Sequence, residues 1–231
     1  MRKVLLVLLI LVAVGLVVAD RVGVRVAQDE IGKQIAAEYR LAQRPDVTIH
    51  GVPFLTQAVS GNYDRIDVKI GNWTEQGVTV GDVRIDMRGV NAPVKEVTKG
   101  EQGRITAETA TASAVIPYDV IRKNAPEQVT SIAKQGDDLK VGLAGTLLGL
   151  RLTGDAVVKV TPSAKGITIK PVTVSSAGLQ LPVAQVAQLQ WTVPVTNLPV
   201  GSRITRIEPT DAGLRVAATA ENVDLNELPA N

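Results

Sequence analysis

The stretch DRVGVRVAQDEIGKQIAAEYRLAQ, residues 20–43, decides the fold because its apolar side chains recur at helical spacing. Gly23 and Gly32 lower its intrinsic helix propensity, so the helix needs a partner surface to be stable. It ends before Arg44-Pro45, since the residue that precedes a proline is disfavoured in the α conformation. The sequence therefore predicts a long helix that buries one apolar stripe, formed by Val24, Ala27, Ile31, Ile35, Tyr39 and Ala42.

An uncharged apolar run, VLLVLLILVAVGLVVA at residues 4–19, precedes this helix. Arg2 and Lys3 stand before it, and Val17 and Ala19 fit a signal-peptidase site, so the pattern indicates export. As a helix the run would span roughly 24 Å, less than the hydrocarbon core of about 30 Å, which favours a cleaved signal. An uncleaved anchor and a buried core helix remain alternatives. As a signal or an anchor, the run places residues 20–231 outside the cytoplasmic membrane.

The composition excludes several classes of protein. The chain has no cysteine, so it has no disulfide, no thiolate nucleophile and no cysteine to acylate. Its formal charge is +2, and Arg2 and Lys3 account for this excess, so residues 20–231 are close to neutral. A nucleic-acid partner is therefore not expected, because such proteins carry a basic face. Aromatic residues make up only 3% of the chain, so aliphatic side chains fill its core.

Most of the remaining sequence alternates as β-strands do. Asp46 to Gly51 predicts a short strand. Ile66, Val68 and Ile70 alternate with charged residues, as Val83, Ile85 and Met87 do, which indicates an antiparallel sheet with one wetted face. Gly71-Asn72 and Gln76-Gly77 suggest turns. The segment RITAETATASAVI, residues 104–116, is a long strand rich in small side chains, and alternation returns from Asp138 onward.

Short helices interrupt these strands. A piece after Pro53, a turn at residues 117–124, a segment at Pro126 to Lys134 and another at Leu181 to Leu189 are the candidates. Residues 222–231 suggest a fraying tail. No internal repeat or linker is present, so the organisation predicted is a leader at 1–19, one domain at 20–228 and a tail at 229–231. The fold class expected is α+β, with the long helix cradled by a long, strongly curved antiparallel sheet and accompanied by short helices.

Catalytic and metal-binding patterns are weak. His50 is the one histidine, so no histidine-rich metal site is expected, and no metal or cofactor is predicted. Asp64 and Asp67 offer the carboxylate pair of a hydrolase, but Asp67 lies on the polar phase of an alternating strand, where a solvated sheet face explains it. No phosphate-binding loop occurs. The protein is therefore predicted not to be an enzyme.

Apolar surface in excess is the remaining signal. A helix with one apolar stripe and a twisted sheet of aliphatic and small residues, with few rings to fill the gap, suggest an aliphatic cleft. An acyl chain buried there would gain about 0.8 kcal/mol per CH₂ group. A fully packed aliphatic core without a cleft is the alternative that composition leaves open.

The segment PDVTIHGVPFLTQAVSGNYDRIDV, residues 45–68, resembles the signature of the LmeA-like family of actinobacterial envelope proteins. Near the other end, Leu198-Pro199-Val200-Gly201, Arg203-Ile204 and Gly213-Leu214 also resemble the family, although Val200 stands where Phe is expected. The resemblance extends over most of residues 20–228. It implies a tubular lipid-binding fold, phospholipid binding at the outer face of the cytoplasmic membrane, a link to lipoglycan assembly and no catalytic residue.

The hypothesis is an exported, membrane-associated phospholipid-binding protein that supports envelope lipid or lipoglycan assembly or lipid transfer. Its partners would be phospholipid, the membrane surface and envelope glycosyltransferases. Two alternatives remain, a non-catalytic scaffold for envelope enzymes and a hydrolase that uses Asp64 and Asp67. The side chains expected to line the acyl site are Ile31, Ile35 and Tyr39 on the helix, Phe54 and Leu55 at the mouth, and Leu147, Leu148 and Trp191 on the sheet side.

Overall fold

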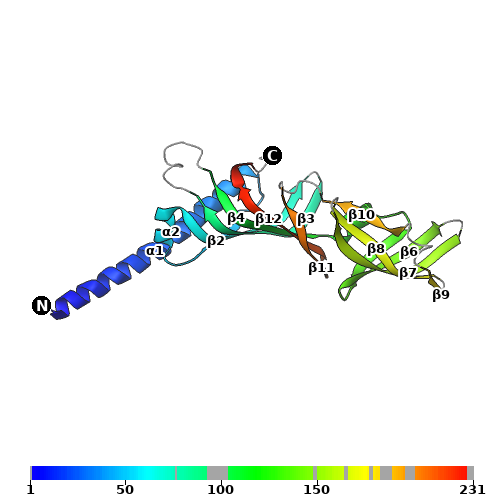
Figure 1. Ribbon diagram of the computed structural model, residues 1–231, viewed down its shortest axis with the longest axis horizontal. Helices are drawn as coiled ribbons and strands as arrows, with labels where there is room; N and C mark the ends of the chain where they lie inside the picture. The colour runs from blue at the N-terminus through cyan, green and yellow to red at the C-terminus, as the bar shows by residue number, and fades with distance from the viewer. Residues whose placement is uncertain are drawn as a thin grey trace. The chain divides into compact units, whose positions relative to one another are not determined.

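A computed structural model describes residues 2–75, 77–92, 104–147, 150–163, 166–176, 179–182, 189–195 and 201–227. It confirms the α+β class, with one long N-terminal helix, antiparallel strands and short helices (Figure 1). The strands form two sheets. The chain divides into two compact units, the first made of residues 1–71, 84–111 and 220–231, and the second of residues 72–83 and 112–219. The single domain at 20–228 stays a prediction.

Helix α1, Arg2–Glu38, runs without a break from the apolar segment into the predicted stripe (Figure 1). It ends at Glu38, five residues before the predicted end at Gln43. Two of its three glycines, Gly23 and Gly32, lie where other segments approach the helix, whereas a Cβ at Gly15 would meet nothing within 4 Å. A Cβ at Gly23 would lie 3.5 Å from the Phe54 ring, and one at Gly32 would lie 2.9 Å from the Pro45 carbonyl oxygen. The glycines therefore allow tight packing, which offsets their low helix propensity.

The first sheet has the order β1-β2-β3-β4-β12-β11. Its strands are β1 at Asp46–His50, β2 at Asn62–Glu75, β3 at Val78–Asn91, β4 at Thr106–Ile116, β11 at Arg203–Thr210 and β12 at Gly213–Asp224. A 3₁₀ turn, η3, follows at Leu225–Glu227. β1 pairs with β2, and β11 with β12, in antiparallel register. Helix α2, Phe54–Ser60, lies between β1 and β2 in the chain and ends at Gly61, which has a φ of 73°.

The second sheet, with the order β10-β8-β7-β6-β5, belongs entirely to the second unit, and β9 pairs with β8. Its strands are β5 at Val129–Gln135, β6 at Asp138–Leu147, β7 at Leu150–Ser163, β8 at Gly166–Ser176, β9 at Leu179–Leu181 and β10 at Trp191–Pro194. Helix α4, Tyr118–Lys123, precedes β5 and confirms the predicted helical turn at residues 117–124. Fully buried aliphatic side chains, among them Leu139, Ile167 and Ile169, form the core of this unit.

Three local predictions are wrong. The segment Pro126 to Lys134 is mostly strand β5, because Val129 and Ile132 pair with Leu143 and Val141 of β6, and this pairing outweighs the local helix signal. Gly71-Asn72 is no turn, since β2 continues through it with Gly71 at a φ of 81°. The chain after Asn222 does not fray at once, because β12 extends to Asp224. Most of the helix predicted at Leu181 to Leu189 lies outside the described residues.

Candidate functional site

The apolar stripe of α1 packs on the first unit's part of the sheet. Val24 of α1 is buried in one cluster with side chains of four strands and of α2. The opposite phase of β1 and β2 carries Asp46, His50, Arg65 and Asp67, so one face of these strands is apolar and the other is charged. The buried members of this first-unit core are Val24, Val47, Ile49, Phe54, Ile66, Val68, Val90 and Ala107.

A rim of half-buried apolar side chains surrounds this core. Ile31 and Ile35 of α1 pack against it but keep part of their surface in contact with solvent. A surface that is packed on one side and open on the other can receive an acyl chain without unfolding. We call this set the apolar rim: Ile31, Ile35, Ile70, Ile85, Met87 and Ile105.

An open cleft of about 780 Å³ lies in the same unit. Its walls carry hydrogen-bonding groups, among them the Asn91 Nδ2, which donates to the Asn62 Oδ1 at 2.6 Å. Three of its lining residues, Tyr63, Val90 and Ala107, also belong to the first-unit core or pack against it. The cleft is lined by Asn62, Tyr63, Asp64, Arg88, Gly89, Val90, Asn91, Thr106, Ala107, Glu108 and Asn222. A polar cleft with an apolar floor suits an amphiphilic ligand.

Tyr63 connects the cleft to the core. Its ring lies 6.4 Å from the Phe54 ring, centroid to centroid, in a tilted arrangement. Burial raises the pKa of the Tyr63 hydroxyl, so the group stays protonated at physiological pH and can donate a hydrogen bond. Tyr63 can therefore contact both the apolar and the polar part of a bound molecule.

Hydrogen bonds to three other elements fix α2 in place. The buried Gln57 side chain donates from Nε2 to the His50 carbonyl oxygen and accepts at Oε1 from the Asp64 N–H. Gly51 has a φ of 100°, and a Cβ there would contact the Gln57 amide, so glycine is required. On the other side, the Asp20 carboxylate of α1 accepts from the Leu55 N–H at 2.8 Å. The helix is thus held by α1, β1 and β2.

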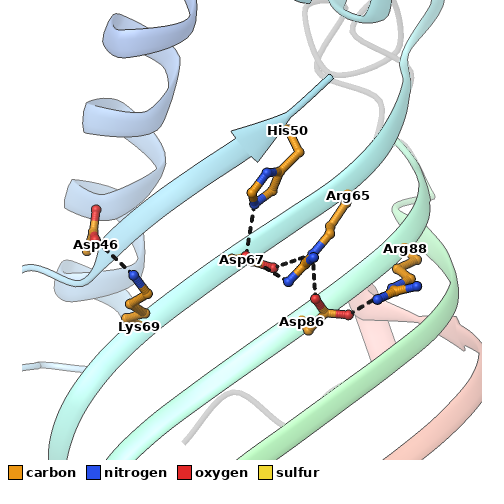
Figure 2. A network of polar contacts seen from close by, with 7 residues as sticks. All are labelled: Asp46, His50, Arg65, Asp67, Lys69, Asp86 and Arg88. Atoms are coloured by element: carbon orange, nitrogen blue, oxygen red, sulfur yellow. Dashed lines mark hydrogen bonds and ion pairs between the residues drawn. The ribbon is translucent and has the colours of Figure 1, made fainter. Parts of the chain in front are cut away.

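A network of charged side chains covers the solvent face of β1 to β3 (Figure 2). His50 Nε2 lies 2.9 Å from the Asp67 Oδ2, and the Arg65 guanidinium binds both Asp67 and Asp86. Arg88 binds the second oxygen of Asp86. Within the network, the carboxylates of Asp67 and Asp86 are balanced by the guanidiniums of Arg65 and Arg88. Its geometry supports a stabilising role for the two strands.

Asp67→Asn is expected to remove part of the acid sensitivity of the first unit. Burial raises the pKa of the Asp67 carboxyl, but hydrogen bonds from His50 and Arg65 outweigh this, and the net pKa is lowered. A folded-state pKa below the unfolded value stabilises the protein above about pH 4, and this stability is lost as the pH falls through the folded pKa. The substitution should lower the free energy of unfolding by about 1 kcal/mol at pH 7. The free energy of unfolding should also fall less steeply as the pH is lowered, as measured by urea unfolding followed by far-UV circular dichroism.

Asp46→Asn is the matched control, because Asp46 lies on the same strand pair with its side chain largely exposed and 3.8 Å from Lys69. It should leave both the stability and its pH dependence unchanged. An acid limb as steep in Asp67→Asn as in the unmodified chain would contradict the role given to the network.

Comparison with known proteins decides the family. The profile of the LmeA-like phospholipid-binding family matches residues 18–219. The chain belongs to this family. No curated protein and no solved structure matches the chain. The LmeA-like family is a phospholipid-binding one, which supports lipid binding by this chain and confirms the resemblance seen in residues 45–68.

The structure brings together some of the site residues that were predicted from the sequence pattern. Ile31, Ile35 and Phe54 contribute to one cluster, Phe54 as a buried member and the two isoleucines on its rim. Leu55 is more exposed and contacts α1 at Gly23. Tyr39 is half-buried just beyond the end of α1, and burial raises the pKa of its hydroxyl.

The predicted sheet-side residues lie elsewhere. Trp191 is buried in the core of the second unit, where its register partner is Ile169 of β8. Leu147 is the last residue of β6 and pairs with Leu150, and Leu148 lies outside the described residues. The eight residues thus do not form one described cluster, and their role in binding stays a prediction.

Sequence reasoning missed the polar cleft and the contacts that hold α2. Asn62 and Asp64 stand in the family segment, but their place at a cleft depends on Gly89, Asn91 and the Thr106 region, far along the chain. In the sequence, one signal for the contacts that hold α2 was Gly51, a glycine two residues before Pro53. Asp20 offered another, as an acid directly after an uncharged run of sixteen residues.

The hydrolase alternative finds little support in this geometry. Asp64 lines the cleft, whereas the Asp67 carboxylate is held by His50 and Arg65. Among the described residues, no group of three or more His, Cys, Asp and Glu side chains could hold a metal ion. The two carboxylates therefore lie in different surroundings.

Proposed function

We propose that this protein binds a phospholipid in its first unit, on the extracytoplasmic side of the cytoplasmic membrane. The observation that carries the proposal is the shared floor of cleft and core, at Tyr63, Val90 and Ala107, in a chain of the LmeA-like phospholipid-binding family. The headgroup would lie in the 780 Å³ cleft, where hydrogen-bonding side chains are available. The acyl chains would lie on the apolar rim.

The apolar rim gives the acyl chains a surface on α1. Each CH₂ group removed from water contributes about 0.8 kcal/mol, so a few contacts with Ile31 and Ile35 are enough for measurable binding. Neither isoleucine lines the 780 Å³ cleft or the two smaller described pockets, of about 380 and 270 Å³. An acyl chain would therefore lie along their exposed edges or part their contacts with the sheet. Phe54 and Leu55 at the mouth remain part of this proposal, whereas Leu147, Leu148 and Trp191 belong to the second unit and stay a separate prediction of lipid contact.

The leader, in this proposal, stays attached as a membrane anchor. Within the described residues, α1 is the helix long and apolar enough to cross a membrane, although a signal sequence passes the same criterion. If the run is kept, it forms one continuous helix with the apolar stripe, from Arg2 to Glu38. The protein would then hold or transfer lipid without catalysis. Its role would be in envelope lipid or lipoglycan assembly, with envelope glycosyltransferases as partners.

The test is recovery and uptake of lipid. The full chain, purified from membranes in detergent and exchanged into amphipol, is expected to yield phospholipid in an organic extract analysed by mass spectrometry. It should also take up a fluorescent phosphatidylcholine from donor vesicles. A preparation that contains no phospholipid and accepts no fluorescent lipid would count decisively against the proposal.

The scaffold alternative retains one observation in its favour. Val52, Leu55 and Val59 expose apolar surface beside α1, and exposed apolar patches mark interaction sites. A scaffold would use this patch to bind an envelope enzyme.

A further inference from the structure

The two faces of helix α2 are both apolar. Phe54 and Ala58, four residues apart, face the first-unit core, with Phe54 buried and Ala58 packed against it. Val59 is 82% exposed, and Leu55, four residues before it, is 39% exposed and also packs against α1 at Gly23. Val52, just before the helix, is 77% exposed. We call Val52, Leu55 and Val59 the α2 patch. Exposed aliphatic side chains that gather in a patch can mark an interaction surface.

The level of the α2 patch along α1 is fixed by two contacts. The Asp20 carboxylate, only 5% exposed, accepts the Leu55 N–H, and Asp20 directly follows the apolar run that ends at Ala19. Less than one turn further, Gly23 lies under the Phe54 and Leu55 side chains. Helix α2 therefore packs on the first turn of α1 beyond the uncharged segment. If residues 4–19 lie in a bilayer, this turn stands at the membrane surface.

We propose that the α2 patch inserts into the outer-leaflet interface beside α1 and so forms a second contact with the lipid surface. This rests on the proposed retention of the anchor. A bilayer is the occupant because the contacts of α2 with Asp20 and Gly23 place the patch at the level where the uncharged run of residues 4–19 ends. Arg25 stands at the same level, where a guanidinium group can meet lipid phosphates, while the Arg21 guanidinium is paired with the Asp20 carboxylate.

The arrangement gives the patch a role in lipid binding. Phe54 connects it to the interior, since the same helix that would touch the membrane through Leu55 and Val59 contributes Phe54 to the first-unit core. The Phe54 ring in turn contacts Tyr63 at the cleft. A phospholipid that leaves the outer leaflet beside α2 would thus meet apolar and then polar side chains of the proposed site.

The experiment uses environment-sensitive labels, which the absence of cysteine makes straightforward. Leu11→Cys, Val59→Cys and Leu179→Cys in the full chain are each labelled with a nitrobenzoxadiazole group. The three chains are reconstituted into vesicles of phosphatidylcholine and phosphatidylglycerol in equal parts. Leu179, in β9, is the matched control, because it is aliphatic and 71% exposed, close to the 82% of Val59. Leu11 reports on the insertion of the anchor itself.

The label at Val59 is expected to show blue-shifted emission, loss of quenching by aqueous iodide, and quenching by lipids that carry a nitroxide near the headgroup. The label at Leu179 should stay accessible to iodide. A different result would be a Leu11 label in the bilayer together with a Val59 label that is as accessible to iodide as the Leu179 label. The α2 patch would then not be a membrane contact and would bind a protein partner instead. The proposed anchor and lipid site would be unaffected. Loss of the Leu11 label by cleavage, or equal membrane quenching at Leu179, would also overturn the inference.

Discussion

Ile35→Asp is expected to abolish uptake of fluorescent phospholipid while the protein still folds. Ile35 lies on the apolar rim, packed on one side and open on the other, so a carboxylate there can reach water in the free protein. A bound acyl chain would cover that carboxylate and remove it from water, which costs several kcal/mol. Uptake should therefore fall by at least about tenfold, equivalent to about 1.4 kcal/mol, in a vesicle-to-protein transfer assay.

Gln34→Asp is the matched control for this substitution. It places the same carboxylate on the neighbouring, exposed position of α1, and it meets the same unfavourable interaction with the C-terminal end of the helix dipole. Its uptake should equal that of the unmodified chain. Unfolding of Ile35→Asp would mean that the rim is part of the folded core, and normal uptake by a folded Ile35→Asp would remove α1 from the acyl site.

Ile169→Ala is expected to destabilise the second unit by about 2–5 kcal/mol. Ile169 is fully buried in β8, between its register partners Val160 of β7 and Trp191 of β10. Its truncation removes apolar contacts and leaves a cavity in a core where neighbouring strands hold their positions. Ile169→Val removes one methylene and should cost about 0.5–1.5 kcal/mol.

Fluorescence can follow this unfolding selectively. The chain has two tryptophans, and both Trp73 and Trp191 belong to the second unit. Urea titrations read by tryptophan emission therefore report on the second unit, and the free energy of unfolding comes from linear extrapolation. A loss below 1 kcal/mol for Ile169→Ala would show that the strands around it relax to close the gap.

Periodicity over long segments predicted the main elements of the fold. The stripe of Val24, Ile31 and Ile35 predicted α1 and the face that it buries, because apolar spacing alone determines both. The alternation of Ile66, Val68 and Ile70 with charged residues predicted β2 and its wetted face. Such patterns are reliable because many residues support one period and each must lie on a particular side of the core.

Short segments were harder to predict because distant partners decide them. Val129 and Ile132 read locally as part of a helix after Pro126, but pairing with β6 makes them a strand. Gly71 looked like a turn, whereas a glycine with positive φ can also stand inside a long strand. Neither outcome depends on residues within the local window.

For the candidate site too, one part could be predicted from the sequence and another could not. The apolar rim on α1 follows from the stripe, so Ile31 and Ile35 could be named in advance. The polar cleft could not, since it joins Asn62 with Asn91 and Asn222, which only the sheet order brings together. Trp191 was assigned to the sheet side from the local sequence pattern, and the second-unit core in which it is buried depends on strand pairing that no local pattern reveals.

The unbroken course of α1 limits the reach of an anchored protein. Beyond Ala19 the helix continues for nineteen residues to Glu38, a rise of about 28 Å, and no flexible tether separates the bilayer segment from the stripe that carries Ile31 and Ile35. A retained anchor would therefore keep the first unit at a set height and rotation above one leaflet. Lipid could then pass only to an acceptor that comes to the protein. This arrangement fits a protein that loads lipid at a fixed place better than one that carries lipid by diffusion.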